Sequence, residues 1–410
     1  MRSKIRIAFI KFGGMAAGGT EKFLQVLAAN LPNDEFDVDY FYCDTAPYVG
    51  SDYRHPGTDA DRLKFMQASQ VRLVEFHVDY KDVTSPIHEW LGTDFGEKFN
   101  ENNYDIIQTG RAGYPEYPFT KIRKIPIVDS LHLSAGVDNQ YNISRVLHIS
   151  RWSADEWIKK GGDAKRVEII STFLDIPDKE YKNLRKELGI ENKFVYGFHQ
   201  RKDDWIYSPI PLAAYKRIED DNTVFLMLNG SDLYKQQAHN LSIKNIIFLP
   251  FAQTQEGIYK FLSTLDVFAH GRKDGEVNSA AMAEAMYFGL PIVSHTSSYS
   301  NGHIECIGEA GRVLNNIDEY ASELKKLKDD KSYYEFRSTE AKKRFAERYE
   351  LKNQIARIVK IYEDVISNPF PHKIRRLYFH SLNQAWKIIY NRYSLMLYRK
   401  LKKIRSKDKE

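Results

Sequence analysis

The feature that most constrains the fold of this chain is a regular alternation of short β-branched runs with amphipathic segments. Apolar runs of this kind predict buried strands, and the segments between them repeat their apolar residues with a helical period. Such alternation is typical of βαβ units, so we predict an α/β fold with parallel sheets covered by helices. The expected strands are residues 4–10, 36–43, 105–109, 126–131, 146–150, 167–172, 194–198, 224–228, 246–251, 267–270, 291–295 and 311–314.

Helices are expected between and after these strands, whereas residues 44–100 are less regular and carry no assignment. A polar, charged stretch at residues 176–192 separates two halves, each of ordinary domain size. We therefore predict a domain at 1–175, a linker at 176–192, a domain at 193–350 and a further helix at 351–367. The expected helices include residues 20–31, 153–160, 258–265, 279–288, 322–328, 333–349 and 351–367.

Composition limits the compartment and the partners. Two cysteines are too few for a disulfide framework, which fits a reducing, cytoplasmic location. No stretch reaches the roughly 20 apolar residues that cross a bilayer, and the short apolar run at the N-terminus is interpreted as a strand.

The C-terminal residues 370–410 form a basic, aromatic extension with twelve Lys or Arg and two acidic residues, although the whole chain carries a net charge of only +5. A basic amphipathic helix on the anionic inner face of a membrane is one interpretation, and a solvated or packed helix pair is the other. Charge alone is a weak signal for nucleic acid, which we do not expect as a partner.

A glutamate pair, Glu276 and Glu284, lies in the segment DGEVNSAAMAEAMYFGLPIVS. Asn278 or Ser279 can cap a helix there, with Glu276 in the loop before it and Glu284 inside it. The first turn of a helix presents free N–H groups and a positive dipole end, which suit an anion such as a diphosphate. Two ordinary surface glutamates are the alternative interpretation.

Three other motifs lie at the carboxyl ends of expected strands, where ligands of α/β sheets bind. The loop KFGGMAAGGTEKF carries Gly18 and Gly19, which serve either a tight turn or a close approach to a ligand. His132 is either structural or part of a site. Arg201 and Lys202 either bind a diphosphate or belong to a solvated charge run. No His, Cys or Asp cluster has a convincing metal-ligand spacing.

Together these segments resemble the retaining glycosyltransferases of family 4, which have the GT-B fold. EVNSAAMAEAMYFGLPIV is similar to the donor signature of that family, and MAAGGTEKFLQVLAANL is similar to its glycine loop and first helix. NIIFLPFAQTQEGIYKFLSTLDVFAHGRKDGE resembles its nucleotide-base strand and the elements that follow. The resemblance covers residues 4–367, in the order of the family. One departure is Phe198, which stands where family members usually have Arg after the glycine at position 197.

The resemblance implies two Rossmann-like domains that face each other across a cleft, with the helix at 351–367 crossing back onto the first domain. The first would bind a glycan or lipid-linked acceptor, and the second a nucleotide-diphosphate-sugar donor. Glu284 would bind the ribose, Glu276 the donor sugar, and His132 would lie near the transferred sugar. The expected catalytic residues are Glu276, His132, Arg201 and Lys202. The expected donor-binding residues are Gly18, Gly19, Arg201, Lys202, Phe251, Glu276, Val277, Asn278, Ser279 and Glu284.

The implied reaction is transfer with retention, without a protein nucleophile, a cofactor or a metal, in the synthesis of a cell-surface polysaccharide or glycolipid. Two alternatives remain. One is a catalytically silent sugar- or nucleotide-binding protein of the same fold. The other is a Rossmann-type oxidoreductase, which the lack of a GxGxxG motif disfavours.

Overall fold

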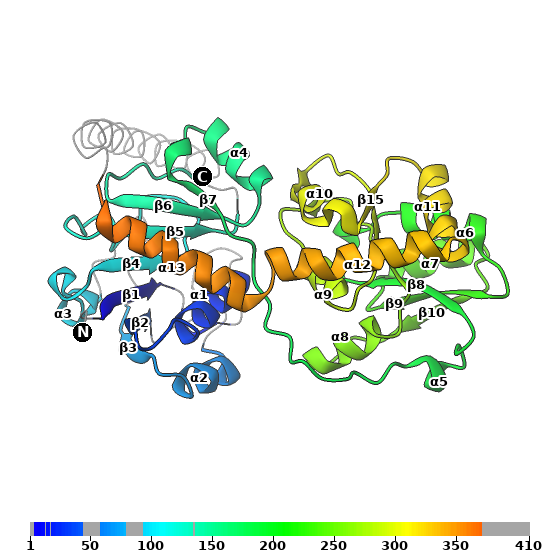
Figure 1. The fold of residues 1–410 in the computed structure, drawn as a ribbon, viewed down its shortest axis with the longest axis horizontal. Coiled ribbons are helices and arrows are strands. Elements are labelled where there is room, and N and C mark those ends of the chain that lie inside the picture. The colour runs from blue at the N-terminus through cyan, green and yellow to red at the C-terminus, as the bar shows by residue number, and fades with distance from the viewer. Residues whose placement is uncertain are drawn as a thin grey trace, which may run out of the picture. The chain divides into compact units, whose positions relative to one another are not determined.

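The computed structural model describes residues 4–370, apart from residues 13, 17, 44–57, 79–92 and 134–135. The basic C-terminal extension thus lies outside the described residues, except for Phe370. The chain divides into two compact units (Figure 1). Unit 1 comprises Met1–Leu147, Trp157–Glu168 and Lys360–Glu410, and unit 2 comprises His148–Glu156 and Ile169–Val359.

Unit 1 is built on a seven-stranded parallel sheet with the order β3-β2-β1-β4-β5-β6-β7. Strand order reverses between β1 and β4, and the carboxyl ends of these strands form the usual ligand-binding edge of such a sheet. Its strands are β1 (Ile5–Lys11), β2 (Phe36–Cys43), β3 (Arg72–Phe76), β4 (Ile106–Thr109), β5 (Ile127–Leu131), β6 (Ile143–His148) and β7 (Val167–Ile169). Its helices include α1 (Gly19–Ala29), α2 (Ala60–Gln67) and α3 (Phe95–Lys98).

Unit 2 is built on a six-stranded parallel sheet with the order β10-β9-β8-β11-β13-β15, in which the order reverses between β8 and β11. Its strands are β8 (Phe194–His199), β9 (Thr223–Leu228), β10 (Ile246–Leu249), β11 (Val267–Ala269), β13 (Ile292–Ser294) and β15 (Gly311–Val313), with a small separate pair of β12 (Gly275–Glu276) and β14 (Ser300–Asn301). Its helices are α5 (Arg185–Leu188), α6 (Ile210–Ile218), α7 (Asp232–Asn240), α8 (Gln255–Leu262), α9 (Ala280–Tyr287), α10 (Gly302–Ile307), α11 (Ile317–Asp329) and α12 (Lys331–Arg348).

Two helices, α4 (Arg151–Lys159) and α13 (Leu351–Ser367), contribute residues to both units. Within unit 1, the C-terminal half of α13 packs on the sheet through the buried Tyr362. The Tyr362 hydroxyl donates a hydrogen bond to Oε1 of Gln108 on β4, at 2.7 Å. Arg145 of β6 forms an ion pair with Asp364 of the same helix. The C-terminal half of α13 is thereby anchored to the sheet of unit 1.

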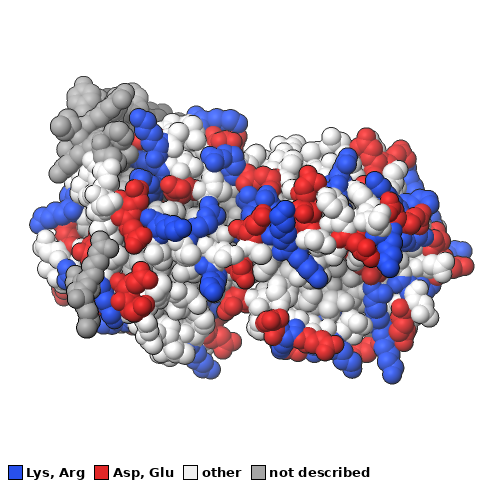
Figure 2. All heavy atoms as spheres, in the orientation of Figure 1, with Lys and Arg blue, Asp and Glu red and all other residues white. Residues whose placement is uncertain are grey.

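The predicted elements are largely confirmed. Each expected strand is present with bounds shifted by at most three residues, and β2 and α13 have the predicted bounds. The unassigned region contains α2, β3 and α3 among its described residues. None of the helices in the described part of the chain is long and apolar enough to span a membrane. Basic and acidic side chains are interspersed over the face drawn in Figure 2.

Candidate functional site

The glutamate segment forms a loop and a helix as predicted. Ser279 is the N-cap of α9, and its hydroxyl accepts a hydrogen bond from Met282 N–H at 3.2 Å. Glu276 ends β12, in the loop before the helix, and Glu284 lies inside α9. Gly289 follows the C-cap with a φ of 72°, the left-handed conformation that glycine adopts without strain. The first turn of α9 therefore lies in sequence between two carboxylates.

The side chain of Glu276 is 12% exposed and lies beside two groups that favour its charged form. Its Oε1 lies 3.0 Å from Nη1 of Arg272 and 3.8 Å from Nε2 of His270. Burial raises the pKa of Glu276, but the nearby His270 ring and the charge of Arg272 outweigh it, and the pKa falls to about 2. The other oxygen, Oε2, is buried without a hydrogen-bond partner among the described residues. A buried anionic oxygen of this kind requires a donor, which a bound sugar hydroxyl can supply.

The loop that carries Glu276 is fixed by a second loop. β12 pairs with β14, so that Gly275 lies opposite Ser300 and Glu276 opposite Asn301. The Glu276 N–H donates to Nδ1 of His303 at 3.4 Å, and Nε2 of His303 donates to a backbone carbonyl of the second loop at 3.0 Å. Gly302 packs so closely that a Cβ there would lie 2.0 Å from the Val277 carbonyl oxygen. The close packing of Gly302 therefore fixes the position of the Val277 backbone.

The side chain of Asn278 forms hydrogen bonds with other residues of unit 2. Its Nδ2 donates to Oγ1 of Thr172 at 3.0 Å and to the Ile149 carbonyl at 3.4 Å. Its Oδ1 accepts from the Tyr349 hydroxyl at 3.4 Å and from the thiol of Cys306 at 3.7 Å. Both hydrogens and both lone pairs of the amide are thus engaged. Only the backbone of Asn278 is left for a donor-binding role.

Glu284 is held by residues of two other elements. Its Oε1 accepts a hydrogen bond from Nε2 of Gln255, the first residue of α8, at 2.6 Å. Its Oε2 lies 3.4 Å from Nε2 of His199, the last residue of β8. Glu284 is buried, so these two partners fix its direction. Phe251, in the loop before α8, is 61% exposed, which is unusual for a large apolar side chain and leaves its ring open to a stacking partner.

The predicted cations lie on the surface. Arg201 pairs with Asp203 through Nε at 3.1 Å, and Lys202 pairs with Asp232 at 3.4 Å. Phe198, at the position where the family usually has Arg, is fully buried in the core of unit 2. The half-buried Arg272 is the cation that contacts Glu276, and it also makes two hydrogen bonds to the Asp274 carboxylate. Arg272 follows β11, at the point where strand order reverses.

Arg272 and His270 were missed in the sequence, although a signal was present. His270 is the last residue of an expected strand, and Arg272 lies two residues after that strand and four residues before Glu276. His270 is nearly fully buried, and its Nδ1 is hydrogen-bonded to the Ser294 hydroxyl at 2.9 Å. Burial lowers the pKa of His270 to about 4, so the ring is neutral at pH 7.

The remaining predicted residues belong to unit 1. Gly18 is the N-cap of α1 with an extended backbone, and a Cβ at Gly19 would meet no atom within 4 Å among the described residues. Neither glycine has the positive φ of a tight turn, whereas Gly14 has a φ of 70°. No described neighbour therefore requires a glycine at position 19 for steric reasons.

His132 directly follows β5 and packs edge-on against Phe23 of α1, with ring centroids 4.8 Å apart. Its Nε2 is buried without a hydrogen-bond partner among the described residues. Burial and the charge of Lys11 lower the pKa of His132 to about 4, so a neutral imidazole is present at pH 7. Lys11, which ends β1, forms a 3.2 Å ion pair with Glu21 of α1.

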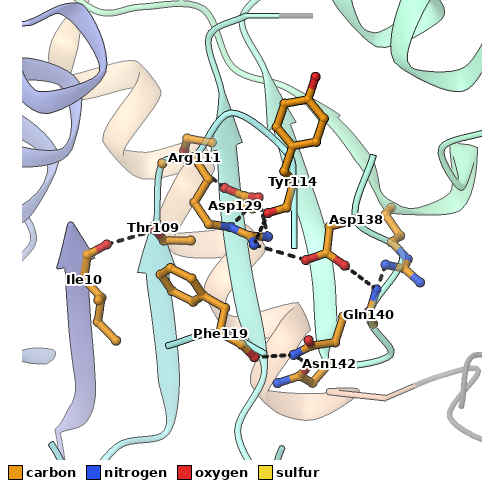
Figure 3. A network of polar contacts seen from close by, with 12 residues as sticks. Ile10, Thr109, Arg111, Tyr114, Phe119, Asp129, Asp138, Gln140 and Asn142 are labelled. Atoms are coloured by element: carbon orange, nitrogen blue, oxygen red, sulfur yellow. Dashed lines mark hydrogen bonds and ion pairs between the residues drawn. The ribbon is translucent and has the colours of Figure 1, made fainter. Parts of the chain in front are cut away.

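A buried ion cluster lies near the same edge of unit 1 (Figure 3). Arg111 follows β4, and its guanidinium contacts Asp129 of β5 at 2.8 Å and Asp138 at 3.1 Å. The cation also lies 4.8 Å from the ring centroid of Phe119. All three charged side chains are almost completely buried. Their mutual contacts consolidate this edge of the sheet.

Comparison with known proteins agrees with this architecture. The crystal structure of HepE from Anabaena in complex with UDP-glucose superimposes with a TM-score of 0.64 at 18% identity, covering 88% of this chain and 100% of HepE. A glycosyltransferase from Rickettsia africae gives a TM-score of 0.67 at 13% identity, over 89% and 99% of the two chains. Two parallel-sheet units and these relatives determine the architecture. The fold is GT-B.

Two further comparisons concern the whole chain and a segment of unit 2, respectively. WaaG, a glycosyltransferase involved in lipopolysaccharide biosynthesis, gives a TM-score of 0.54 at 13% identity, over 87% of this chain and 99% of WaaG. The model of the family "Glycosyl transferases group 1" matches residues 181–344, which contain both glutamates and Arg272. No curated protein matches the chain in sequence. Among the described residues, no group of three or more His, Cys, Asp or Glu side chains is arranged to hold a metal ion.

Proposed function

We propose that this protein is a retaining glycosyltransferase that moves a sugar from a nucleotide-diphosphate donor to an acceptor hydroxyl. The observation that carries the proposal is the pair Glu276 and Glu284 around the first turn of α9, within the segment that matches the glycosyltransferase family model. Glu284 would hold the ribose and Glu276 the donor sugar. HepE binds UDP-glucose, which supports a UDP-sugar as the donor of this chain.

The leaving diphosphate gains negative charge as the glycosidic bond breaks, and preorganised positive groups accelerate that step. Free N–H groups at the start of α9 supply one such group. Arg272 supplies a cation at the reversal point of the sheet, and Arg201 and Lys202 supply exposed cations on the neighbouring loop. We propose that these groups act without a metal ion.

Retention requires no protein nucleophile if the acceptor attacks the face that the diphosphate leaves, with a phosphate oxygen taking the proton. The neutral imidazole of His132 would then accept or donate a hydrogen bond near the acceptor. WaaG acts in lipopolysaccharide biosynthesis, which supports a glycolipid or polysaccharide acceptor. We also propose peripheral membrane contact through residues 370–410, which liposome co-sedimentation with and without that segment tests.

Glu284→Ala is expected to weaken UDP binding about tenfold, because it removes a charge-assisted hydrogen bond to the ribose. UDP affinity is measured by calorimetry, and UDP release and the anomeric configuration of the product are followed with a panel of UDP-sugars. Glu347→Ala, at an exposed position of α12, is the control. Unchanged UDP affinity in Glu284→Ala removes the ribose assignment. UDP binding without donor hydrolysis or transfer would identify a silent nucleotide-binding protein.

Arg272→Lys is expected to lower kcat about tenfold, because a lysine cannot contact Asp274 through two nitrogens and Glu276 through a third. Arg201→Ala tests the competing cation and is expected to reduce transfer more than nucleotide binding. Steady-state kinetics separates kcat from KM, with Arg312→Lys on the exposed side of β15 as the control. A normal kcat in Arg272→Lys would indicate that Arg201 and Lys202, and not Arg272, stabilise the leaving diphosphate.

A further inference from the structure

Two large aromatic side chains of unit 2 are exposed side by side. Trp205 is 53% exposed and Tyr299 is 55% exposed, and their ring centroids lie 5.5 Å apart with an interplanar angle of 57°. Trp205 lies in the short turn after β8, and Tyr299 in the loop after β13. Both loops leave the carboxyl edge of the sheet, on either side of β11. The glutamate loop also leaves that edge.

The backbone of Lys273, three residues before Glu276, ties both aromatic loops to the glutamate loop. Its N–H donates to the carbonyl of the buried Ile206 at 3.0 Å, which anchors the Trp205 turn. Its carbonyl accepts from the Ser297 hydroxyl at 2.8 Å, and the same hydroxyl oxygen accepts from the Tyr299 N–H at 3.0 Å. The backbones that carry the two rings are thus fixed with respect to the glutamate loop.

The size of the pair narrows the class of ligand. An aromatic side chain buries about 150–250 Å² when covered, so two half-exposed rings fall well short of the ~800 Å² that each partner contributes to a standard protein interface. A planar nucleobase stacks on one aromatic face. Rings inclined at 57° instead form a corner, which suits the puckered C–H faces of a pyranose. Arg201 and Asp203, in the same loop as Trp205, offer polar partners for hydroxyl groups.

We propose that Trp205 and Tyr299 form a carbohydrate subsite that holds a pyranose ring of the acceptor glycan. This inference rests on the proposed function for its place in the reaction, but its binding step can be measured independently. The electron-rich ring faces attract the partly positive C–H groups of the sugar, and the polar groups of the neighbouring loop bind its hydroxyls.

The test is glycan-array binding of the full-length protein, followed by titration of each bound oligosaccharide. Trp205→Ala and Tyr299→Ala are expected to weaken that binding about tenfold each, the loss expected for one aromatic stacking surface. Trp205→Phe should restore most of it. Phe336→Ala, which removes an exposed ring from α12, should leave it unchanged. UDP affinity and donor hydrolysis should stay within twofold of wild type in all four variants.

Several outcomes overturn the subsite. The first is an array on which the wild type binds no pyranose glycan. The second is equal glycan binding by Trp205→Ala and wild type. The third is a loss of UDP affinity in Trp205→Ala or Tyr299→Ala as large as the loss of glycan binding, which would identify a nucleobase platform. If the two alanine variants lose self-association of the protein and not glycan binding, the aromatic pair is a protein contact, and the subsite is also overturned. Failure of the proposed function is distinct, because the wild type would then release no UDP from UDP-sugars, whether or not it binds UDP and whatever its glycan binding.

Discussion

Replacing Arg111 by methionine should destabilise unit 1 by about 3–5 kcal/mol, the cost of leaving buried carboxylates without their cation. Asp129 and Asp138 both depend on this guanidinium, with contacts of 2.8 and 3.1 Å in an almost fully buried environment (Figure 3). Methionine fills much of the same volume, so the effect reports the lost charge and hydrogen bonds more than a cavity. The Arg111 N–H also donates to Asp129, at 3.2 Å, which a substitution leaves in place.

The measurement requires a readout local to unit 1, because a chain of two units need not unfold in one step. Hydrogen exchange of β4 and β5 amides under increasing urea supplies it. Arg72→Met is the matched control, since the Arg72 side chain is 69% exposed and its ion pair with Asp39 should contribute no more than about 1 kcal/mol. Equal effects of the two variants would contradict the argument. Adding Asp129→Asn and Asp138→Asn to Arg111→Met should recover much of the loss.

The alternation of strands and helices could be predicted from the sequence because buried parallel strands are continuous apolar runs. β9, for example, is buried along its whole length and was predicted within one residue. β3 was missed because it lies at the edge of its sheet, with only Phe76 fully buried. α2 was missed for a similar reason, since Met66 is its only buried residue and its apolar period is weak.

The positions of the candidate site residues on a loop and a helix could be predicted where these residues are close in sequence. Glu276, Ser279 and Glu284 lie on one loop and helix, and helix-capping rules placed them correctly. Their partners come from elsewhere in the chain: Gln255 begins another helix, and His199 ends another strand. Only the fold brings these residues together, so no local pattern could identify them. The roles of the predicted site residues stay predictions.

The aromatic pair and the glutamate loop of unit 2 differ in their expected sensitivity to substitution. Ring contacts on the surface can be removed without moving the backbone, whereas the glutamate loop is packed backbone against backbone at Gly302. Small misplacements of a catalytic loop have large kinetic effects, because binding energy is used to orient the reacting groups. Gly302 should therefore be the most sensitive position outside the glutamates themselves.

Gly302→Ala should lower kcat/KM about 100-fold, because the new Cβ would lie 2.0 Å from the Val277 carbonyl oxygen and must displace the backbone before α9. The accompanying loss of stability should be only about 1–3 kcal/mol, as for other overpacked sites. UDP release from the accepted UDP-sugar gives the first value, and urea denaturation the second. Gly96→Ala is the control, since its Cβ would lie 3.9 Å from the nearest side-chain atom. Transfer within threefold of wild type would show that the loop before α9 does not position the donor.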